Sequence, residues 1–467
     1  MFIFRKIRKK IKEIFAILAA LTVAFSVGGN EGQSEPASET KGLIFSTTRT
    51  ETTKESVAES SASSAETETY ILLADEMTFI RGKGASFSNG VVTVDKGGTY
   101  IFKGELNEGR IVVDLKERDE ETTLKFYGVR INSSMGAPIS VRKSKERTVL
   151  DFEKGTVNTF SDTDERVLSY NEDEGDSAVI FSKGDLVITG EGSVNIEAKF
   201  NKGIFSRKDI TLKGANLNIV SFDDGIRSND STLIERSKLH IMSGGDGIHI
   251  GDNNRDIKGK ILVYDSDCSI LSEYDGIESA GDVFLCGGKI DITAAGGSTG
   301  RYYKKKHAGV FSESSGPDKN KNDILATGRA TADSSTLERL MEKKASFTGI
   351  SAKGSAVLRD VIMSISSVHN GLDSKSIEIE NGHYSVKSDG DGFYVTEDIS
   401  VDGGDINIAS CHNGMDCKKA RFTDGKIFIS AYNEGVVCRE ESEGAFIDSA
   451  EVQIEKTARD KAILPIP

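Results

Sequence analysis

The sequence predicts an all-β protein, a right-handed parallel β-helix with 21–22 residues and three short strands in each rung. The first observation is a recurring turn in which glycine is followed by an apolar residue and usually preceded by Asp or Asn. Most neighbouring copies lie 21 or 22 residues apart, and a fixed period of this size is typical of a solenoid. The copies are Lys202–Ile204, Asp224–Ile226, Asp246–Ile248, Asp275–Ile277, Thr348–Ile350, Asn370–Leu372, Asp391–Phe393, Asn413–Met415 and Glu434–Val436.

The second observation is that apolar residues keep fixed offsets from the turn glycine. The position after the glycine is apolar in every copy, from Ile204 to Val436. The positions six and eight before it are apolar as well, as in Ile219 with Leu217 and Ile429 with Ile427. Because alternate residues of a strand point to the same face, these columns predict an apolar interior in which like residues stack.

One column holds two cysteines on successive rungs, Cys417 and Cys438. Adjacent strands place their Cα atoms about 4.8 Å apart, which a disulfide can bridge. The spacing is equally compatible with a disulfide and with two stacked buried thiols.

The chain before the rungs divides into three segments. Residues 1–29 combine a basic start with a short apolar run, which indicates a signal peptide or an N-terminal anchor and therefore export to the cell surface or beyond. Residues 30–69 are rich in Ser, Thr and Glu and are typical of a disordered stalk. Residues 70–162 alternate apolar and polar residues, which predicts a β cap with entry rungs.

The β-helix is expected over residues 163–467, interrupted by an inserted loop at 298–348 in which residues 335–344 have the pattern of a short helix. We expect a monomer with no membrane contact beyond the N-terminal segment. The formal net charge of −14 argues against nucleic acid as a partner, because phosphates require a basic surface.

The acidic residues before the turn glycines have two interpretations. Asp-Gly pairs form turns for purely structural reasons. Stacked on successive rungs, however, Asp224, Asp246 and Asp275 would lie about 5 Å apart, where two like charges cost roughly 3 kcal/mol at an effective dielectric of 20. A bound cation would relieve that cost, and an all-oxygen ligand set favours Ca²⁺. The predicted calcium ligands are Asp223, Asp224, Asp246, Asp275, Glu278, Asp373, Asp391 and Asp416.

An extended face lined by carboxylates and calcium suits a polysaccharide, particularly an acidic one whose carboxylates could share the metal. The chain has no Trp, so few aromatic side chains are available to stack on neutral sugars. The predicted carbohydrate contacts are Arg227, His249, Tyr394 and Tyr303.

Several glycine-rich stretches resemble a known bacterial family. They are Asp223–Arg227, Gly244–Ile248, Gly287–Ile292 and Gly403–Ile408, and similarity extends from Thr99–Gly104 to Glu434–Val436. The family is that of exported carbohydrate-binding β-helix proteins with a pectate-lyase-like fold. The resemblance implies binding of calcium, polygalacturonate and cellulose without demonstrated cleavage. This chain departs from the family in its additional Lys, Arg, His and Cys residues and in its 298–348 insert.

The sequence is therefore compatible with three functions. The first is an exported, non-catalytic protein that binds acidic polysaccharide with calcium. The alternative is a pectate-type polysaccharide lyase, in which calcium acidifies the proton beside a uronate carboxylate and Arg227 is the candidate base. The third is a structural surface adhesin that uses the β-helix as a rigid spacer.

Overall fold

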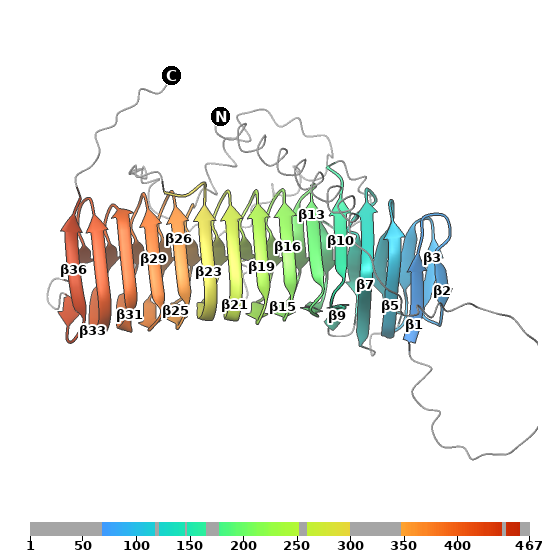
Figure 1. Ribbon diagram of the computed structural model, residues 1–467, viewed down its shortest axis with the longest axis horizontal. Coiled ribbons are helices and arrows are strands. Elements are labelled where there is room, and N and C mark those ends of the chain that lie inside the picture. The colour runs from blue at the N-terminus through green and yellow to red at the C-terminus, as the bar shows by residue number, and fades with distance from the viewer. Residues whose placement is uncertain are drawn as a thin grey trace, which may run out of the picture. The chain divides into compact units, whose positions relative to one another are not determined.

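The computed structural model describes residues 68–116, 121–144, 147–164, 177–251, 259–298, 347–440 and 445–457. Within these ranges the chain is all-β: it forms strands β1 to β36 and no helix (Figure 1). None of the described segments could therefore cross a bilayer as a helix. The predicted signal peptide, nearly all of the stalk, the expected helix at 335–344 and Tyr303 lie outside the described residues.

The strands belong to two long sheets. The smaller sheet contains β3 (Ala85–Ser88), β4 (Val91–Val94), β6 (Arg110–Asp114), β8 (Ile139–Lys143), β11 (Ala178–Ser182), β14 (Lys202–Ser206), β17 (Ile226–Ser228), β20 (Ile248–Ile250), β22 (Ile277–Ser279), β24 (Ile350–Ala352), β27 (Leu372–Ser374), β30 (Phe393–Val395), β32 (Met415–Cys417) and β34 (Val436–Cys438).

The larger sheet contains β1 (Glu68–Leu73), β2 (Phe79–Arg81), β5 (Gly98–Leu106), β7 (Thr122–Ser133), β9 (Arg147–Phe152), β10 (Val157–Asp162), β12 (Asp185–Thr189), β13 (Ser193–Ala198), β15 (Ile210–Lys213), β16 (Asn216–Ser221), β18 (Thr232–Glu235), β19 (Lys238–Ser243), β21 (Ile261–Ser272), β23 (Val283–Ala294), β25 (Ala356–Arg359), β26 (Ile362–Ser367), β28 (Ile377–Glu380), β29 (His383–Ser388), β31 (Asp398–Cys411), β33 (Lys419–Ala431), β35 (Ala445–Ile447) and β36 (Glu451–Lys456).

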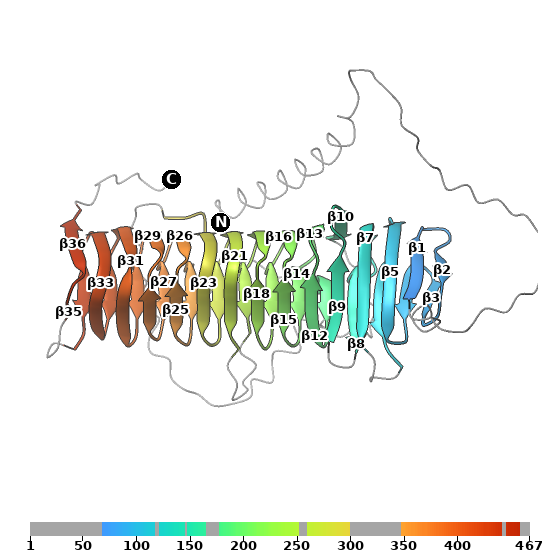
Figure 2. The same ribbon diagram turned by 60° about the horizontal axis from the view of Figure 1, so that its bottom comes forward.

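The strands form rungs, each consisting of one strand from the smaller sheet and two strand positions from the larger one. Strands β14, β15 and β16 make one such rung and pair in parallel with β17, β18 and β19 of the next. Figure 2 shows β14 and β27 of the smaller sheet lying along the same stack as the larger sheet. The predicted all-β class with parallel strands is confirmed, whereas the right-handed coil stays a prediction.

In some rungs the two strand positions of the larger sheet merge into one long strand, as in β21, β23, β31 and β33. Residues with positive φ lie at the junction, including Asp265 in β21 and Gly287 with Gly288 in β23. Such residues bend the chain locally, so both halves of the strand keep pairing with the neighbouring rung.

The predicted columns are confirmed by the strand register. The residues that follow the turn glycine pair from Ile204 through Ile226, Ile248 and Ile277 to Ile350, and then from Leu372 to Val436. All but the last of these side chains are completely buried. Stacking of like residues therefore builds one continuous core along the rungs.

The turn glycines are required because neighbouring rungs approach closely at the corner. A Cβ atom built on Gly225 would lie 2.4 Å from a methyl carbon of Ile241 and 2.6 Å from the Gly247 carbonyl oxygen. Gly247 repeats this arrangement with Ile270 and Gly276. No side chain fits at these distances, which explains why the glycine is kept while its neighbours vary.

The two ends of the stack differ. At the N-terminal end β2 and β3 pair antiparallel with β1 and β4, which in turn pair in parallel with β5 and β6 (Figure 1). At the C-terminal end, in the part of the chain that the structure describes, β35 and β36 pair with β33 and no further rung follows them. The core is consequently exposed to solvent at this end. Ile429 is completely buried, whereas its register partner Ile454 is 51% exposed.

This pair provides a test of where stability resides. We expect Ile429→Ala to lower the free energy of unfolding by about 2–5 kcal/mol, because it leaves a cavity in the closed core. The same substitution at Ile454 should cost less than about 1 kcal/mol, because half of that side chain already contacts solvent. Chemical denaturation of both variants checks this. Equal losses would show that the open end is covered in solution.

Cys417 and Cys438 are register partners, as the period predicts. Both are free thiols in the structure. The Cys417 thiol lies 3.7 Å from the carbonyl oxygen of Val437, to which it donates, and its pKa is raised to about 12 by burial and then by Cys438 beside it. The structure therefore corresponds to the stacked-thiol alternative.

Candidate functional site

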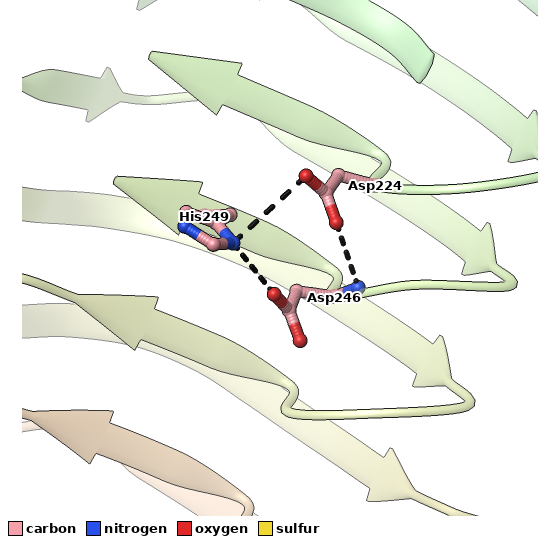
Figure 3. Close-up of side chains that lie close together, drawn as sticks. All are labelled: Asp224, Asp246 and His249. Atoms are coloured by element: carbon pink, nitrogen blue, oxygen red, sulfur yellow. Dashed lines mark hydrogen bonds and ion pairs between the residues drawn. The ribbon is translucent and has the colours of Figure 1, made fainter. Parts of the chain in front are cut away.

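The aspartates before the turn glycines form a ladder between rungs. Oδ1 of Asp224 accepts a hydrogen bond from the backbone N–H of Asp246 at 3.1 Å (Figure 3). Oδ1 of Asp246 accepts from the N–H of Asp275 at 3.0 Å, and Oδ1 of Asp275 from Thr348 at 2.7 Å. The three aspartates are only 3%, 9% and 1% exposed. One oxygen of each therefore holds the next rung in place.

The same hydrogen bond recurs in later rungs, including one in which asparagine takes the place of aspartate. Oδ1 of Asn370 accepts from the N–H of Asp391 at 2.8 Å, and Oδ1 of Asp391 accepts from Asn413 at 3.0 Å. An amide oxygen does the same work as a carboxylate oxygen here. Oδ1 of these residues therefore has a structural role: it accepts a hydrogen bond from the backbone of the following rung.

The second carboxylate oxygen, Oδ2, of Asp224 and of Asp246 contacts a basic side chain on the smaller sheet. Oδ2 of Asp224 lies 2.9 Å from Nη1 of Arg227 on β17, and Oδ2 of Asp246 lies 2.6 Å from Nδ1 of His249 on β20. Figure 3 shows the His249 ring facing both aspartates, with 3.9 Å between Nδ1 and Oδ2 of Asp224. Nδ1 of His249 also lies 3.3 Å from Oε2 of Glu278 on β22.

These contacts explain why the acids titrate differently. Burial alone would raise the pKa of Asp224, but the charges of His249, Arg227 and Lys202 hold it below its usual value. Asp246 also contacts His249, but burial and then the charge of Asp224 raise its pKa to about 7. Burial likewise raises the pKa of Glu278 to about 7, although His249 opposes the shift.

The column two places after the turn glycine lies partly inside the molecule. Arg227, His249 and Glu278 are register partners on adjacent strands of this column. His249, however, is buried, and the other two are half-buried. They pack between carboxylates of neighbouring rungs, so the chain itself supplies counter-ions at Asp224 and Asp246. This removes part of the electrostatic argument for a metal at Asp224.

Two groups of side chains in the described residues have potential metal ligands within 4.8 Å of one another. In the first, Asp224, Asp246 and His249, a ring nitrogen is among the donors and Arg227 already occupies Asp224. The second, Asp246, Asp275 and Glu278, offers three carboxylates and only oxygen donors. Hard cations such as Ca²⁺ prefer oxygen ligands, so the donor set of the second group suits calcium better than that of the first. His249 lies against two members of the second group, Asp246 and Glu278, and a cation there would compete with its ring nitrogen.

Four of the predicted calcium ligands lie elsewhere and, among the described residues, join neither group. Asp223 pairs with Nζ of Lys202 at 2.7 Å, Asp373 accepts from Asn370 at 2.6 Å, and Asp416 pairs with Nε of Arg439 at 2.8 Å. Asp391 belongs to the ladder, and its pKa is raised to about 6, mainly by burial. The predicted set therefore divides into one cluster and several local pairs.

The predicted carbohydrate contacts also divide. Arg227 is a salt-bridge partner of Asp224, and His249 lies inside the acid cluster. Tyr394 is 37% exposed, in register with Asp373 and Asp416, and the Arg439 guanidinium lies 5.3 Å from its ring centre.

An aromatic pair beside the acid cluster, Tyr274 and Phe347, was not predicted from the sequence. Tyr274 and Phe347 lie two places before the turn glycines of successive rungs, and their rings stack with centroids 5.8 Å apart. Phe347 precedes Thr348–Ile350, the weak copy that follows the insert. Applying the column offset to that copy would have found it.

Comparison with known proteins shows what this chain is related to. A family model described as carbohydrate-binding domain-containing protein matches residues 88–392 and 339–464, well over half of the chain. The chain belongs to that family. The predicted carbohydrate-binding relationship is thereby confirmed at the level of the family.

A relative from Acetivibrio thermocellus, also described as a carbohydrate-binding domain-containing protein, is 32% identical over 136 residues. The match covers 29% of this chain and 47% of that relative's length. A solved structure of a polysaccharide lyase-like protein from C. thermocellum, a gadolinium derivative, is 26% identical with a TM-score of 0.46. It covers 49% of this chain and 92% of the other.

Proposed function

We propose that this family member is an exported, non-catalytic protein that binds an acidic polysaccharide, of the polygalacturonate type, through calcium. The fold we propose for it is a right-handed parallel β-helix. The observation that carries the proposal is the group Asp246, Asp275 and Glu278, in which three carboxylates from adjacent rungs converge within 4.8 Å.

The group suits a shared metal. Three carboxylates leave part of the coordination sphere of Ca²⁺ for water or for another oxygen ligand. A uronate carboxylate of a polymer would supply such a ligand. Without a cation, the polymer's negative charge would be repelled by a chain of net charge −14. Calcium therefore accounts for how an acidic protein holds an acidic ligand.

A direct test is retention of polygalacturonate by the purified protein, with calcium or with a chelator. We expect retention with calcium and loss of it with chelator, and weaker retention of a neutral glucan under both conditions. A second aliquot monitored for absorbance of unsaturated products tests cleavage. We expect none, because the candidate base Arg227 is bound to Asp224.

The alternatives give different outcomes. Accumulation of unsaturated product would establish the lyase. Equal retention of polygalacturonate in calcium and in chelator would remove the metal from the proposal. Failure to retain any polysaccharide would leave the structural adhesin.

A further inference from the structure

We propose that two exposed Asn-Gly turns, Asn89–Gly90 and Asn381–Gly382, are sites of spontaneous modification to aspartate and isoaspartate. The reaction consumes water, releases ammonia and requires no enzyme. The sequence contains two further Asn-Gly pairs, Asn370–Gly371 and Asn413–Gly414, which the fold protects. The inference is independent of the proposed function, because neither exposed turn belongs to the groups of potential metal ligands.

An Asn-Gly pair has a side-chain amide next to a backbone nitrogen that no side chain shields. The glycine nitrogen attacks Cγ of the asparagine, and the new N–C bond closes a cyclic succinimide. The proton of the glycine nitrogen and the side-chain amide group leave together as ammonia. Water then opens the ring at either carbonyl. One product is aspartate, and the other is isoaspartate, in which the main chain passes through the former side chain. The reaction therefore requires a glycine nitrogen that the asparagine side chain can reach.

The first exposed pair forms the turn between β3 and β4, where Ser88 pairs with Val91. Asn89 and Gly90 both have positive φ, 50° and 75°, as in the tight hairpin turns that favour Asn-Gly. The Asn89 side chain is exposed. Among the described residues, the N–H of Gly90 has no backbone hydrogen-bond partner. No such bond has to break before this nitrogen reacts.

The second exposed pair forms the corner between β28 and β29. Asn381 is exposed, and the φ values of Asn381 and Gly382 are 54° and 96°. The N–H of Gly382, too, lacks a backbone partner within the described ranges. One restraint is added here, because the hydroxyl of Tyr384 donates to the Asn381 carbonyl at 2.6 Å. This bond holds the peptide group that joins Asn381 to Gly382, so we expect Asn381 to react more slowly than Asn89.

The third pair lies in the hydrogen-bonded ladder between rungs. The N–H of Gly371 donates to the Asp391 carbonyl at 3.0 Å. The Asn370 side chain is 6% exposed and is held at both ends, since Oδ1 accepts from the N–H of Asp391 at 2.8 Å and Nδ2 donates to Asp373 at 2.6 Å. Reaction at Asn370 therefore requires two rungs to separate first.

The fourth pair is restrained in the same way. The N–H of Gly414 donates to the Glu434 carbonyl at 2.9 Å. The Asn413 side chain is 8% exposed, and its Oδ1 accepts from Asn433 at 2.9 Å. The fold thus divides four chemically identical pairs into two available and two protected ones.

The test incubates the purified protein in mildly alkaline buffer, well below its melting temperature, and follows each Asn-Gly peptide by mass spectrometry. An isoaspartate-specific methyltransferase provides a second readout. We expect conversion of Asn89 and Asn381 to exceed that of Asn370 and Asn413 by about tenfold or more, because bonds between rungs must open before the latter react. In a denatured sample, which is the control, all four should convert at similar rates.

Tyr384→Phe separates the two exposed turns. It removes the hydroxyl and keeps the buried ring, so conversion at Asn381 should accelerate severalfold, whereas Asn89 serves as the internal control. An unchanged rate at Asn381 would reject the restraint assigned to Tyr384. Conversion of Asn370 or Asn413 as fast as that of Asn89 in the folded protein would overturn the proposal. So would a folded protein in which Asn89 stays intact while the denatured control converts.

Discussion

Added Ca²⁺ is expected to raise the melting temperature of the wild-type protein and to leave that of Asp246→Asn unchanged. Asp246 belongs to the three-carboxylate group that fits calcium. Calcium at a hundred times its Kd would stabilise the wild type by about 2.7 kcal/mol. The corresponding rise in melting temperature is several degrees, at about 2–4 °C per kcal/mol for a domain of 150–250 residues.

Asparagine is the informative substitution because the ladder already contains it. Asn370 makes the same inter-rung hydrogen bond through its amide oxygen, at 2.8 Å to the N–H of Asp391. Asp246→Asn should therefore keep the bond to Asp275 through its amide oxygen, while an NH2 group replaces the charged Oδ2 that faces His249. In calcium-free buffer the variant should be at least as stable as the wild type, since a buried carboxylate beside Asp224 has been neutralised.

The matched control is Asp391→Asn. Asp391 occupies the same column and makes the same bond, to Asn413 at 3.0 Å, but belongs to neither ligand group. Its calcium response should equal that of the wild type. An undiminished calcium response in Asp246→Asn would exclude this cluster as the calcium site, whatever Asp391→Asn does.

The fold was predictable because it depends on a period. Each rung repeats the same requirement: a glycine where Ile241 and the Gly247 carbonyl approach, and an apolar residue directly after it. Such requirements recur at a fixed spacing, so the columns and the Cys417–Cys438 register could be derived from spacing alone. Handedness does not affect the spacing, and so it could not be derived in this way.

The site was predictable only in part, because its chemistry depends on what each atom contacts. The spacing places Asp224, Asp246 and Asp275 in one column, but it cannot show that Oδ1 serves the backbone while Oδ2 faces the neighbouring strand. Nor does the spacing show that Arg227 and His249 turn toward these acids. The insert hid the aromatic pair, since 73 residues separate Tyr274 from Phe347 in the sequence.

The second large effect is a reversal of the pH dependence of stability by calcium. Without calcium, we expect the protein to be more stable at pH 5 than at pH 8. The pKa of Asp246 and that of Glu278 are each raised to about 7 in the folded state. In the unfolded chain the corresponding values are about 3.9 and 4.3.

The sign follows from proton binding. Between pH 4 and pH 7 the folded state holds protons that the unfolded state has released, so stability falls as pH rises through this window and stays low above it. One pKa unit corresponds to about 1.4 kcal/mol, and we expect a difference of at least that size between pH 5 and pH 8. Asp391, with a pKa of about 6, contributes in the same direction.

Calcium should act in the opposite sense, because it binds the ionised carboxylates and competes with their protons. Its stabilising effect should therefore be larger at pH 8 than at pH 5, and the two stability curves should converge toward pH 5. Thermal melts from pH 5 to pH 8, with calcium-stripped and calcium-loaded protein, measure both curves. Asp246→Asn should flatten the calcium-free curve, and the slope attributable to Asp391 should disappear in Asp391→Asn. A calcium-free stability that rises toward pH 8 would mean that His249 and Arg227 already neutralise the cluster, and that no further cation is needed there.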